Sequence, residues 1–112
     1  MQAVDVVYDR AAFLDRLDGD ETLAREIEAL FLAEMTDEIE ALASASARRE
    51  CGVLAAHAHA VKGAAANLGA IALQAVAAAM ERLAREARLN ETTALLADMR
   101  IAFARLRAAV AG

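Results

Sequence analysis

The side chains of this sequence best suited to chemistry are two histidines, His57 and His59, and a lysine, Lys62, three residues after the second. Imidazole can act near pH 7 as a nucleophile, a proton carrier or a metal ligand, because both of its protonation states are populated there. Lys62 is the only lysine, since the other eleven of the twelve basic residues are arginine. The spacing of the three side chains decides which of these chemistries is available.

The spacing of the two histidines argues against a shared metal ion. Residues two apart on a helix point about 200° away from each other, whereas paired helical ligands need a spacing of three or four. The chain also has no Glu-x-x-His pattern, the motif that holds two iron ions in helical bundles. We therefore expect no metal site.

The helical period gives the two histidines different surroundings. The apolar residues within about 60° of Val61 define a buried stripe: Leu54, Ala58, Ala65 and Leu68. His57 lies about 40° from Val61, at the edge of the stripe, so we expect it to be packed or hydrogen-bonded there. His59 lies about 160° from Val61 and should face outward.

Five small residues share the outward half of this helix with His59: Gly52, Ala55, Ala56, Gly63 and Ala66. An exposed helical face normally carries long polar side chains, and a glycine inside a helix costs about 1 kcal/mol relative to alanine. A bare face lets a partner approach the ring, and Lys62, one turn away, can reach an anion held on it. The arrangement fits a site that carries a phosphoryl group. The alternative is an ordinary exposed histidine beside an exposed lysine.

Composition favours an all-α fold. The 112 residues include 32 alanines and no proline, so the best helix former is abundant and the strongest helix breaker is absent. The alanines also inflate the nominal hydrophobic content of 59%. The length suits a single domain over residues 1–112. Because apolar residues recur every three or four positions, we expect an antiparallel up-and-down four-helix bundle with a short additional N-terminal helix.

Caps and turn residues set the expected helix bounds. The short helix should cover about residues 9–17, and the bundle helices about 20–45, 50–68, 70–89 and 90–110. Asp20 and Asn90 are the expected N-caps of the second and fifth helices, and Gly69 should end the third in a left-handed conformation. The expected buried stripe of the second helix is Leu23, Ile27, Leu30, Phe31, Met35, Ile39 and Leu42. In the fourth helix the stripe is Leu73, Val76, Met80, Leu83 and Ala87.

Charge and composition exclude several classes of protein. The net charge is −5 without a concentrated basic patch, which argues against nucleic acid as a partner. A single cysteine permits no internal disulfide, and the N-terminus shows no secretory signal, so we expect a cytoplasmic protein. The eighteen uncharged residues between Lys62 and Glu81 are mostly small, so they fit two helices and a tight turn better than a membrane span. A bundle that buries its own stripes should be a monomer.

The residues from His59 onward resemble the signature of histidine-containing phosphotransfer (HPt) domains. That signature is a histidine, any residue, an aliphatic residue, Lys-Gly, small residues and then Gly-Ala, and residues 59–70 read HAVKGAAANLGA. The turn LDGDE at 17–21, the Leu-Phe pair at 30–31 and Met-Glu at 80–81 extend the resemblance over nearly the whole chain. The chain departs from the pattern at Ala64 and Ala65, where the family often has serine. It also lacks the common Gly-Asp before the third helix.

The resemblance implies a phosphorelay intermediate, as in bacterial two-component systems. His59 would accept a phosphoryl group from the aspartyl phosphate of a hybrid histidine kinase's receiver domain and pass it to the receiver domain of a response regulator. Lys62 would steady the phosphate's charge, and Gly63 would let the receiver approach. Mg²⁺ is expected on the receiver and no cofactor on this chain. Docking through the third and fourth helices would use Ala55, Ala56, Gly63, Ala66 and Asn67.

Bundle geometry adds Glu81 to the candidate site. His59 lies ten residues before Gly69 and Glu81 twelve after it, so on antiparallel helices both are roughly 15–18 Å from the turn. On its own helix Glu81 is about 100° from Met80, a flanking position rather than a buried one. We hypothesise that Glu81 accepts a hydrogen bond from one ring nitrogen and leaves the other as the nucleophile. The alternative is a surface ion pair with Arg85, four residues on.

Two other functions stay open. One is the phosphoacceptor module of a chemotaxis-type histidine kinase, although a chain that runs from Met1 to Gly112 with no attached domain leads us to expect a free-standing protein. The other is a non-catalytic helical interaction protein, against which the intact set of His59, Lys62 and Gly63 argues. Neither GxxxxGK[ST] nor GxGxxG occurs in the sequence, so we expect no independent kinase or ATP-binding activity.

Overall fold

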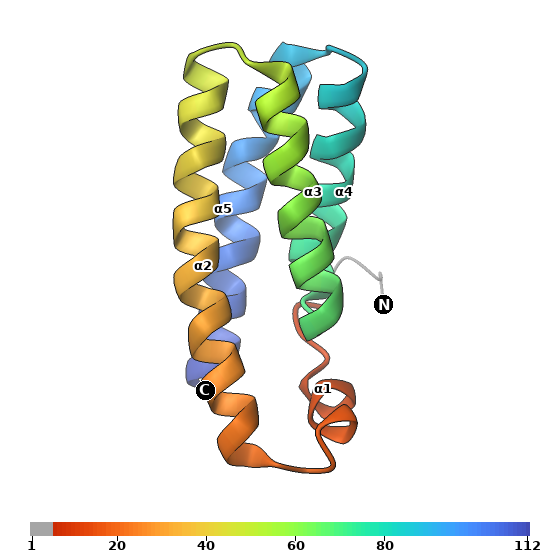
Figure 1. Cartoon of the computed structure of the whole chain (residues 1–112), viewed down its shortest axis with the longest axis vertical. Coiled ribbons are helices and arrows are strands. Elements are labelled where there is room, and N and C mark those ends of the chain that lie inside the picture. The colour runs from red at the N-terminus through yellow and green to blue at the C-terminus, as the bar shows by residue number, and fades with distance from the viewer. Residues whose placement is uncertain (1–5) are drawn as a thin grey trace.

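Five helices run through residues 6–112, the part of the chain that this computed structural model describes. They are α1 (Arg10–Arg16), α2 (Glu21–Ala47), α3 (Cys51–Leu68), α4 (Ile71–Arg85) and α5 (Leu89–Ala111). The four long helices form an up-and-down bundle, and α1 lies at one end of it (Figure 1). Helices α3 and α5 each pack against α2 and α4, so they are diagonal in the bundle. The expected all-α fold with a short additional helix is confirmed.

Every turn between these helices contains residues with positive φ. They are Asp18 and Gly19 (φ 53° and 76°), Arg49 (59°), Gly69 (90°) and Ala87 (57°). After each, a backbone N–H bonds back across the last helical turn, as Ala70 N does to the carbonyl of Ala65 at 2.9 Å. These bonds satisfy carbonyl groups that a helix end would otherwise leave unpaired. Gly69 therefore ends α3 in the left-handed conformation that its residue type predicts.

One expected bound and one expected cap are wrong, and both concern the turn before α5. Helix α4 ends at Arg85 instead of residue 89, because Ala87 leaves the helix with positive φ and Arg88 N bonds back to the carbonyl of Leu83 at 3.0 Å. Ala87 is consequently exposed in the turn and not part of the buried stripe. Helix α5 starts at Leu89 with Arg88 at its N-cap, so the expected cap, Asn90, lies inside the first turn.

The core consists largely of the stripes that the helical period predicts. All five stripe residues of α3 are buried: Leu54, Ala58, Val61, Ala65 and Leu68. In α2 the stripe is buried from Phe31 to Leu42, but Leu30 is 64% exposed and Leu23 is also exposed, contrary to expectation. Leu23 and Leu30 each precede a buried residue, Ala24 and Phe31, by one position, which places them about 100° away from the buried face of α2. Beyond that face, the first turns of α2 extend past the end of α3 toward α1 (Figure 1).

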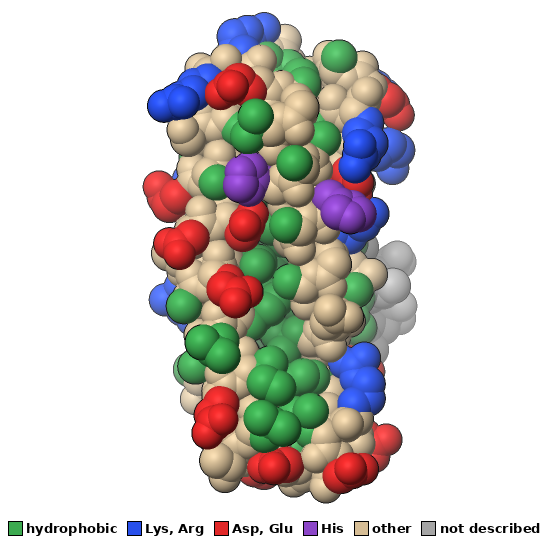
Figure 2. Space-filling view, in the orientation of Figure 1, with side chains coloured by type: hydrophobic (Ala, Val, Ile, Leu, Met, Phe, Trp, Pro, Cys, Tyr) green, Lys and Arg blue, Asp and Glu red, His purple; other side chains and the backbone are tan. Residues whose placement is uncertain are grey.

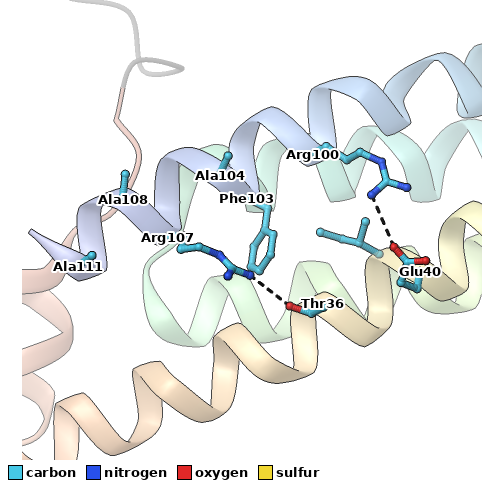
Figure 3. A pocket seen from close by; sticks show the side chains of 9 residues that line it. Thr36, Glu40, Arg100, Phe103, Ala104, Arg107, Ala108 and Ala111 are labelled. Carbon is cyan, nitrogen blue, oxygen red and sulfur yellow. Dashed lines mark hydrogen bonds and ion pairs between the residues drawn. The ribbon is translucent and has the colours of Figure 1, made fainter.

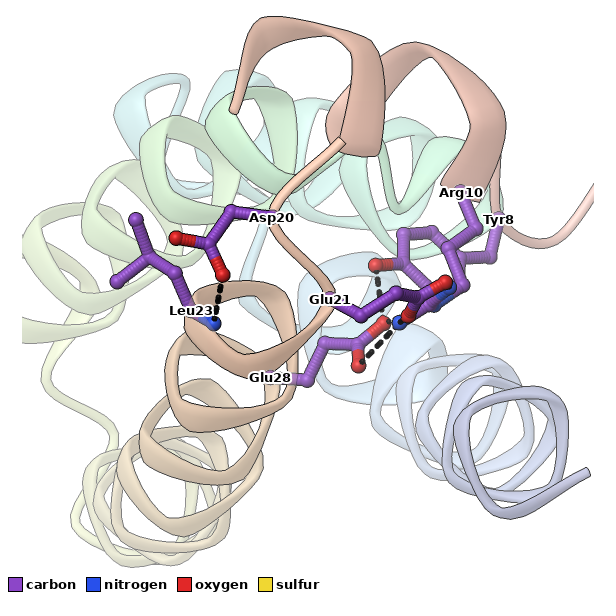
Figure 4. Close-up of polar contacts among 6 residues, drawn as sticks. All are labelled: Tyr8, Arg10, Asp20, Glu21, Leu23 and Glu28. Carbon is purple, nitrogen blue, oxygen red and sulfur yellow. Dashed lines mark hydrogen bonds and ion pairs between the residues drawn. The ribbon is translucent and has the colours of Figure 1, made fainter. Parts of the chain in front are cut away.

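A buried carboxylate ties the N-terminal segment to α2. Glu28 is buried, and its Oε2 accepts hydrogen bonds from the hydroxyl of Tyr8 at 2.6 Å and from Nε of Arg10 at 2.8 Å. Arg10 also pairs with Glu21, while Asp20 caps α2 as expected by accepting a bond from the N–H of Leu23 (Figure 4). Burial, together with the bond to Glu28, raises the pKa of the Tyr8 phenol above its usual range. These bonds compensate the buried charge and fix α1 at the end of the bundle.

The uncharged run between Lys62 and Glu81, residues 63–80, is divided between two helices. Within residues 6–112, no helix is both long enough and apolar enough to span a bilayer. The run begins in α3, turns at Gly69 and continues in α4, as expected for two helices joined by a tight turn. Its buried members, among them Ala65, Ala72 and Ala77, pack α3 against α4.

Candidate functional site

The two histidines of α3 differ in exposure as the helical period predicts. The side chain of His59 is 62% exposed, whereas that of His57 is 35% exposed and faces α2. Both rings, purple in Figure 2, reach the same face of the molecule. His59 is therefore open to a partner, and His57 is an edge residue.

Glu81 of α4 is the centre of the polar contacts around His59. Its Oε2 lies 2.9 Å from Nδ1 of His59, and Arg85 donates to the same oxygen through Nη2 at 2.6 Å and Nε at 3.0 Å. Its Oε1 lies 2.5 Å from Nζ of Lys62. We call these four residues the Glu81 cluster. The hydrogen bond expected between Glu81 and the ring is present, and so is the alternative ion pair with Arg85.

Glu81 is buried, which corrects the flanking position expected for it. Only 7% of the residue is exposed, because the side chains of His59, Lys62 and Arg85 gather over the carboxylate. The hydrogen bonds from Lys62, Arg85 and His59, in that order of importance, lower the pKa of Glu81 from 4.5 to about 2, although burial acts in the opposite direction. The group is therefore a carboxylate throughout the physiological range of pH.

The charge of Glu81 determines which nitrogen of a neutral His59 ring carries the proton. A carboxylate accepts hydrogen bonds and donates none, so Nδ1 must hold the proton in the bond to Oε2. In that tautomer the lone pair lies on Nε2, the other ring nitrogen. The geometry thus prepares Nε2 as a nucleophile on an exposed ring.

His57 has a carboxylate partner of its own on α2. Its Nδ1 lies 2.8 Å from Oε2 of Glu38, which confirms the expected hydrogen-bonded edge position. Lys62 and Arg85 form no ion pair with Glu38, because both are bonded to Glu81. The cations that could stabilise an added phosphoryl group therefore gather at His59 and not at His57.

The small residues expected to form a docking face divide into exposed and buried ones. Ala56, Gly63, Ala66 and Asn67 are exposed along α3, but Ala55 is buried, contrary to expectation. Because α3 packs against both α2 and α4, its buried arc is wider than the single stripe considered in the sequence. Ala55 instead forms part of the wall of an open depression of about 500 Å³ between α3 and α4, beside Ala56, Ala84 and Arg85.

An apolar groove adjoins the other end of this face. Ile27, Leu30 and Phe31 of α2 line it together with Ala64 and Asn67 of α3. Its volume is about 260 Å³, and the exposed Leu30 is on its wall. The groove shares Asn67 with the expected docking face, so apolar surface continues from that face onto α2.

A third groove lies between α2 and α5 and contains no residue of the Glu81 cluster. It has a volume of about 500 Å³ and is lined mainly by Ile39, Phe103 and alanines of α5 (Figure 3). Arg107 stacks on the ring of Phe103 at 4.9 Å and donates to Thr36, and Arg100 pairs with Glu40. Because α5 is diagonal to α3, this groove is separate from the surface around His59.

Two members of the site were not identified in the sequence as functional candidates. The spacing of four residues indicates Arg85 only as a surface partner of Glu81, and nothing in the sequence indicates Glu38. Within residues 6–112, no three His, Cys, Asp or Glu side chains are grouped closely enough to hold a metal ion. The chemistry that the Glu81 cluster offers is that of an imidazole with neighbouring cations.

Comparison with known proteins agrees with this geometry. A family model described as the Hpt domain matches residues 26–109, three quarters of the chain. The fold is similar to the crystal structure of histidine-containing phosphotransfer protein B from Pseudomonas aeruginosa PAO1, with a TM-score of 0.86 and 23% sequence identity. That match covers 92% of this chain and 90% of the other, and at this identity it shows a shared fold. No curated protein matches the sequence significantly.

Proposed function

The chain belongs to the Hpt domain family, the histidine phosphotransfer proteins of phosphorelays, and we propose that His59 is the residue that carries its phosphoryl group. The observation that carries this proposal is the combination of an exposed ring, a carboxylate on Nδ1 and two cations on that carboxylate. His57 lacks the neighbouring cations and is half-buried against α2. The two histidines are therefore not equivalent acceptors.

The transfer starts from the tautomer that Glu81 selects. The lone pair of His59 Nε2 attacks the phosphorus of an aspartyl phosphate on a receiver domain. A P–N bond forms while the P–O bond to the aspartate breaks, and the aspartate leaves as a carboxylate with the bonding electrons. The ring keeps its Nδ1 proton and becomes positively charged, and Glu81 stabilises that charge through the existing hydrogen bond. The reverse sequence returns the group to a second receiver.

The other predicted residues serve the phosphoryl group and its donor. Lys62, one helical turn from His59, supplies a positive charge to the phosphate oxygens. Gly63 leaves open space beside the ring, since a Cβ at this position would meet no atom within 4 Å. Ala56, Ala66 and Asn67 extend this surface along α3 for contact with a receiver.

Hpt domains work with receiver domains, and we assign two such partners to this chain. One is the receiver of a hybrid histidine kinase and the other the receiver of a response regulator, and we propose that the chain meets them in the cytoplasm as a monomer. The receiver would hold the Mg²⁺ ion that compensates phosphate charge during transfer. The Hpt domain then contributes the imidazole, the cations and a surface free of obstruction.

Phosphotransfer from a labelled receiver tests this assignment. The purified chain is mixed with a receiver domain carrying ³²P-aspartyl phosphate, and the label on the chain is tested for the acid lability and alkali stability of phosphohistidine. We expect label on the wild type and on His57→Gln, and none on His59→Gln. Label that survives in His59→Gln and disappears in His57→Gln would contradict the assignment. Labelling by a kinase's ATP-binding domain, with none by any receiver, would favour a chemotaxis-type module instead.

A further inference from the structure

Glu81 holds more hydrogen-bond donors than one carboxylate needs. Its Oε2 accepts three bonds, one from His59 and two from Arg85, while Oε1 pairs with Lys62. A carboxylate oxygen has two lone pairs, so the donors on Oε2 compete with one another. Lys62 and His59 both have an assigned task in the transfer, but Arg85 has none. The bond of Arg85 to Oε2, which already accepts a bond from His59, therefore needs a separate explanation.

Arg85 is free to exchange partners. Its side chain is 59% exposed, and the bonds to Glu81 use only part of a guanidinium group with five N–H donors. Arg85 and the His59 ring share the same oxygen, so the guanidinium lies within two hydrogen-bond lengths of the ring. Arg85 also lines the open depression between α3 and α4, where the other lining residues carry no charge. A phosphoryl group on Nε2 would lie on the side of the ring away from Oε2, so Arg85 would have to leave Glu81 and extend its long, exposed side chain past the ring to reach it.

We propose that Arg85 is a second phosphate-binding cation of this site, held on Glu81 until the phosphoryl group arrives and then bonded to the phosphoryl oxygens. This inference rests on the proposed role of His59. A dianionic phosphoryl group offers three acceptor oxygens, and the planar fork of arginine fits two of them at once. When Arg85 leaves, Oε2 keeps its bond to the positively charged ring, so Glu81 is not left unpaired. Before transfer, Glu81 thus holds Arg85 near the ring, and after transfer Arg85 binds the phosphoryl group of the phosphohistidine.

The matched control for this proposal is Arg82, one turn earlier on α4. Arg82 is exposed on the same helix and carries the same charge, but the Glu81 cluster does not include it. Arg85→Met keeps the length of the apolar stem and removes the charge, Arg85→Lys keeps the charge without the fork, and Arg82→Met changes net charge alone. The three variants separate a local role of Arg85 from a general effect of charge.

Two measurements test the exchange. First, the chain is phosphorylated by phosphoramidate without any receiver, and the arginine Nε–Hε resonances are followed by NMR, with the Arg85 signal assigned by its loss in Arg85→Met. We expect that signal to move on phosphorylation of the wild type and to stay in place in His59→Gln. Second, we expect the rate of transfer from receiver aspartyl phosphate to fall about tenfold in Arg85→Met, to recover partly in Arg85→Lys and to be unchanged in Arg82→Met.

The outcomes distinguish this inference from the proposed function. A phosphorylated His59 with an unmoved Arg85 signal, or equal rates in Arg85→Met and Arg82→Met, would overturn the inference alone. A wild-type chain that takes no phosphoryl group on His59 would overturn the proposed function and this inference together. If Arg85→Met does not fold, Arg85→Lys supplies the assignment, because lysine has no Nε–Hε group and the Arg85 signal is lost there too, and the wild-type spectrum decides.

Discussion

His59 Nδ1 lies 2.9 Å from Glu81 Oε2, although the two residues are 22 positions apart and belong to different helices. The tight turn at Gly69 makes this contact possible, because it brings α3 and α4 back side by side with the two residues at the same level. A mobile surface pair would orient the ring poorly. Here the carboxylate is buried and held by two further cations, so the ring bonds to a fixed acceptor.

Glu81→Gln should slow phosphotransfer about tenfold or more, because the neutral amide stabilises the charged product ring less than a carboxylate does. The variant should also change the tautomer of His59. ¹⁵N chemical shifts of the imidazole, which differ between protonated and unprotonated nitrogens, measure that change independently of the rate. We expect mainly Nδ1–H in the wild type and a mixture in the variant.

Glu38→Gln is the matched control, since it removes the carboxylate of the other histidine pair. Its transfer rate and the tautomer of His59 should both equal those of the wild type. Equal tautomer populations in the wild type and Glu81→Gln would show that Glu81 does not select the nucleophile.

Protonation of Glu81 in acid should lower the free energy of unfolding. Its pKa is about 2 in the folded chain against an ordinary value of 4.5, so its contribution is fully present above pH 4.5 and is lost as the pH falls toward 2. Urea unfolding at several pH values in this window should give a steeper fall in the free energy of unfolding for the wild type than for Glu81→Gln. Equal slopes would mean that the cations do not lower this pKa.

The sequence carried enough information to place His59, His57 and Glu81, because helical period and distance from a turn depend only on regular backbone geometry. The bonding around Glu81 could not be obtained in this way. It depends on the conformations of Lys62 and Arg85, two long side chains whose directions are decided by each other and by the carboxylate. The same holds for the burial of Glu81, which those side chains produce.

The turns show a second limit of sequence reasoning. The residue type of Gly69 predicts its left-handed conformation, but Arg49 and Ala87 adopt the same conformation although their residue types do not predict it. Only the packing of successive helices fixes where those two turns must occur. Leu30 is a related case, since periodicity alone does not show which of two adjacent apolar residues, Leu30 or Phe31, faces the core.

Ala87→Gly should stabilise the protein by up to about 1 kcal/mol. A left-handed conformation costs alanine roughly 1–2 kcal/mol, and Ala87 has positive φ. Glycine avoids most of this cost but loses somewhat more backbone entropy on folding. Ala84→Gly, three residues earlier and inside α4, should instead destabilise it. Chemical denaturation of the two variants measures both changes, and a loss of stability in Ala87→Gly would argue against the positive φ at this turn.

Leu30→Ser should weaken binding of a receiver domain with little effect on folding. Leu30 is exposed beside Asn67, so the leucine contributes little to the core but extends the docking face with apolar surface. We expect a several-fold increase in Kd, measured by calorimetry with a phosphorylation-deficient receiver. Ile101→Ser is the control, because Ile101 is similarly exposed (58%) but belongs to α5, diagonal to α3. Equal effects of the two substitutions would show that the groove between α2 and α3 is not part of the interface.

Gly63→Ala should make the protein more stable and less active. A methyl group at Gly63 meets no atom within 4 Å, and alanine is favoured over glycine inside a helix by about 1 kcal/mol. The same substitution at Gly69 should cost about 1–2 kcal/mol, because φ is 90° and the new Cβ would lie 3.2 Å from the carbonyl oxygen of Asp9. Urea unfolding should therefore give opposite signs for the two variants. Transfer from receiver aspartyl phosphate should nevertheless be several-fold slower in Gly63→Ala, since the methyl group lies one turn from His59, where the receiver approaches. A transfer rate equal to that of the wild type would show that Gly63 is not needed for this approach.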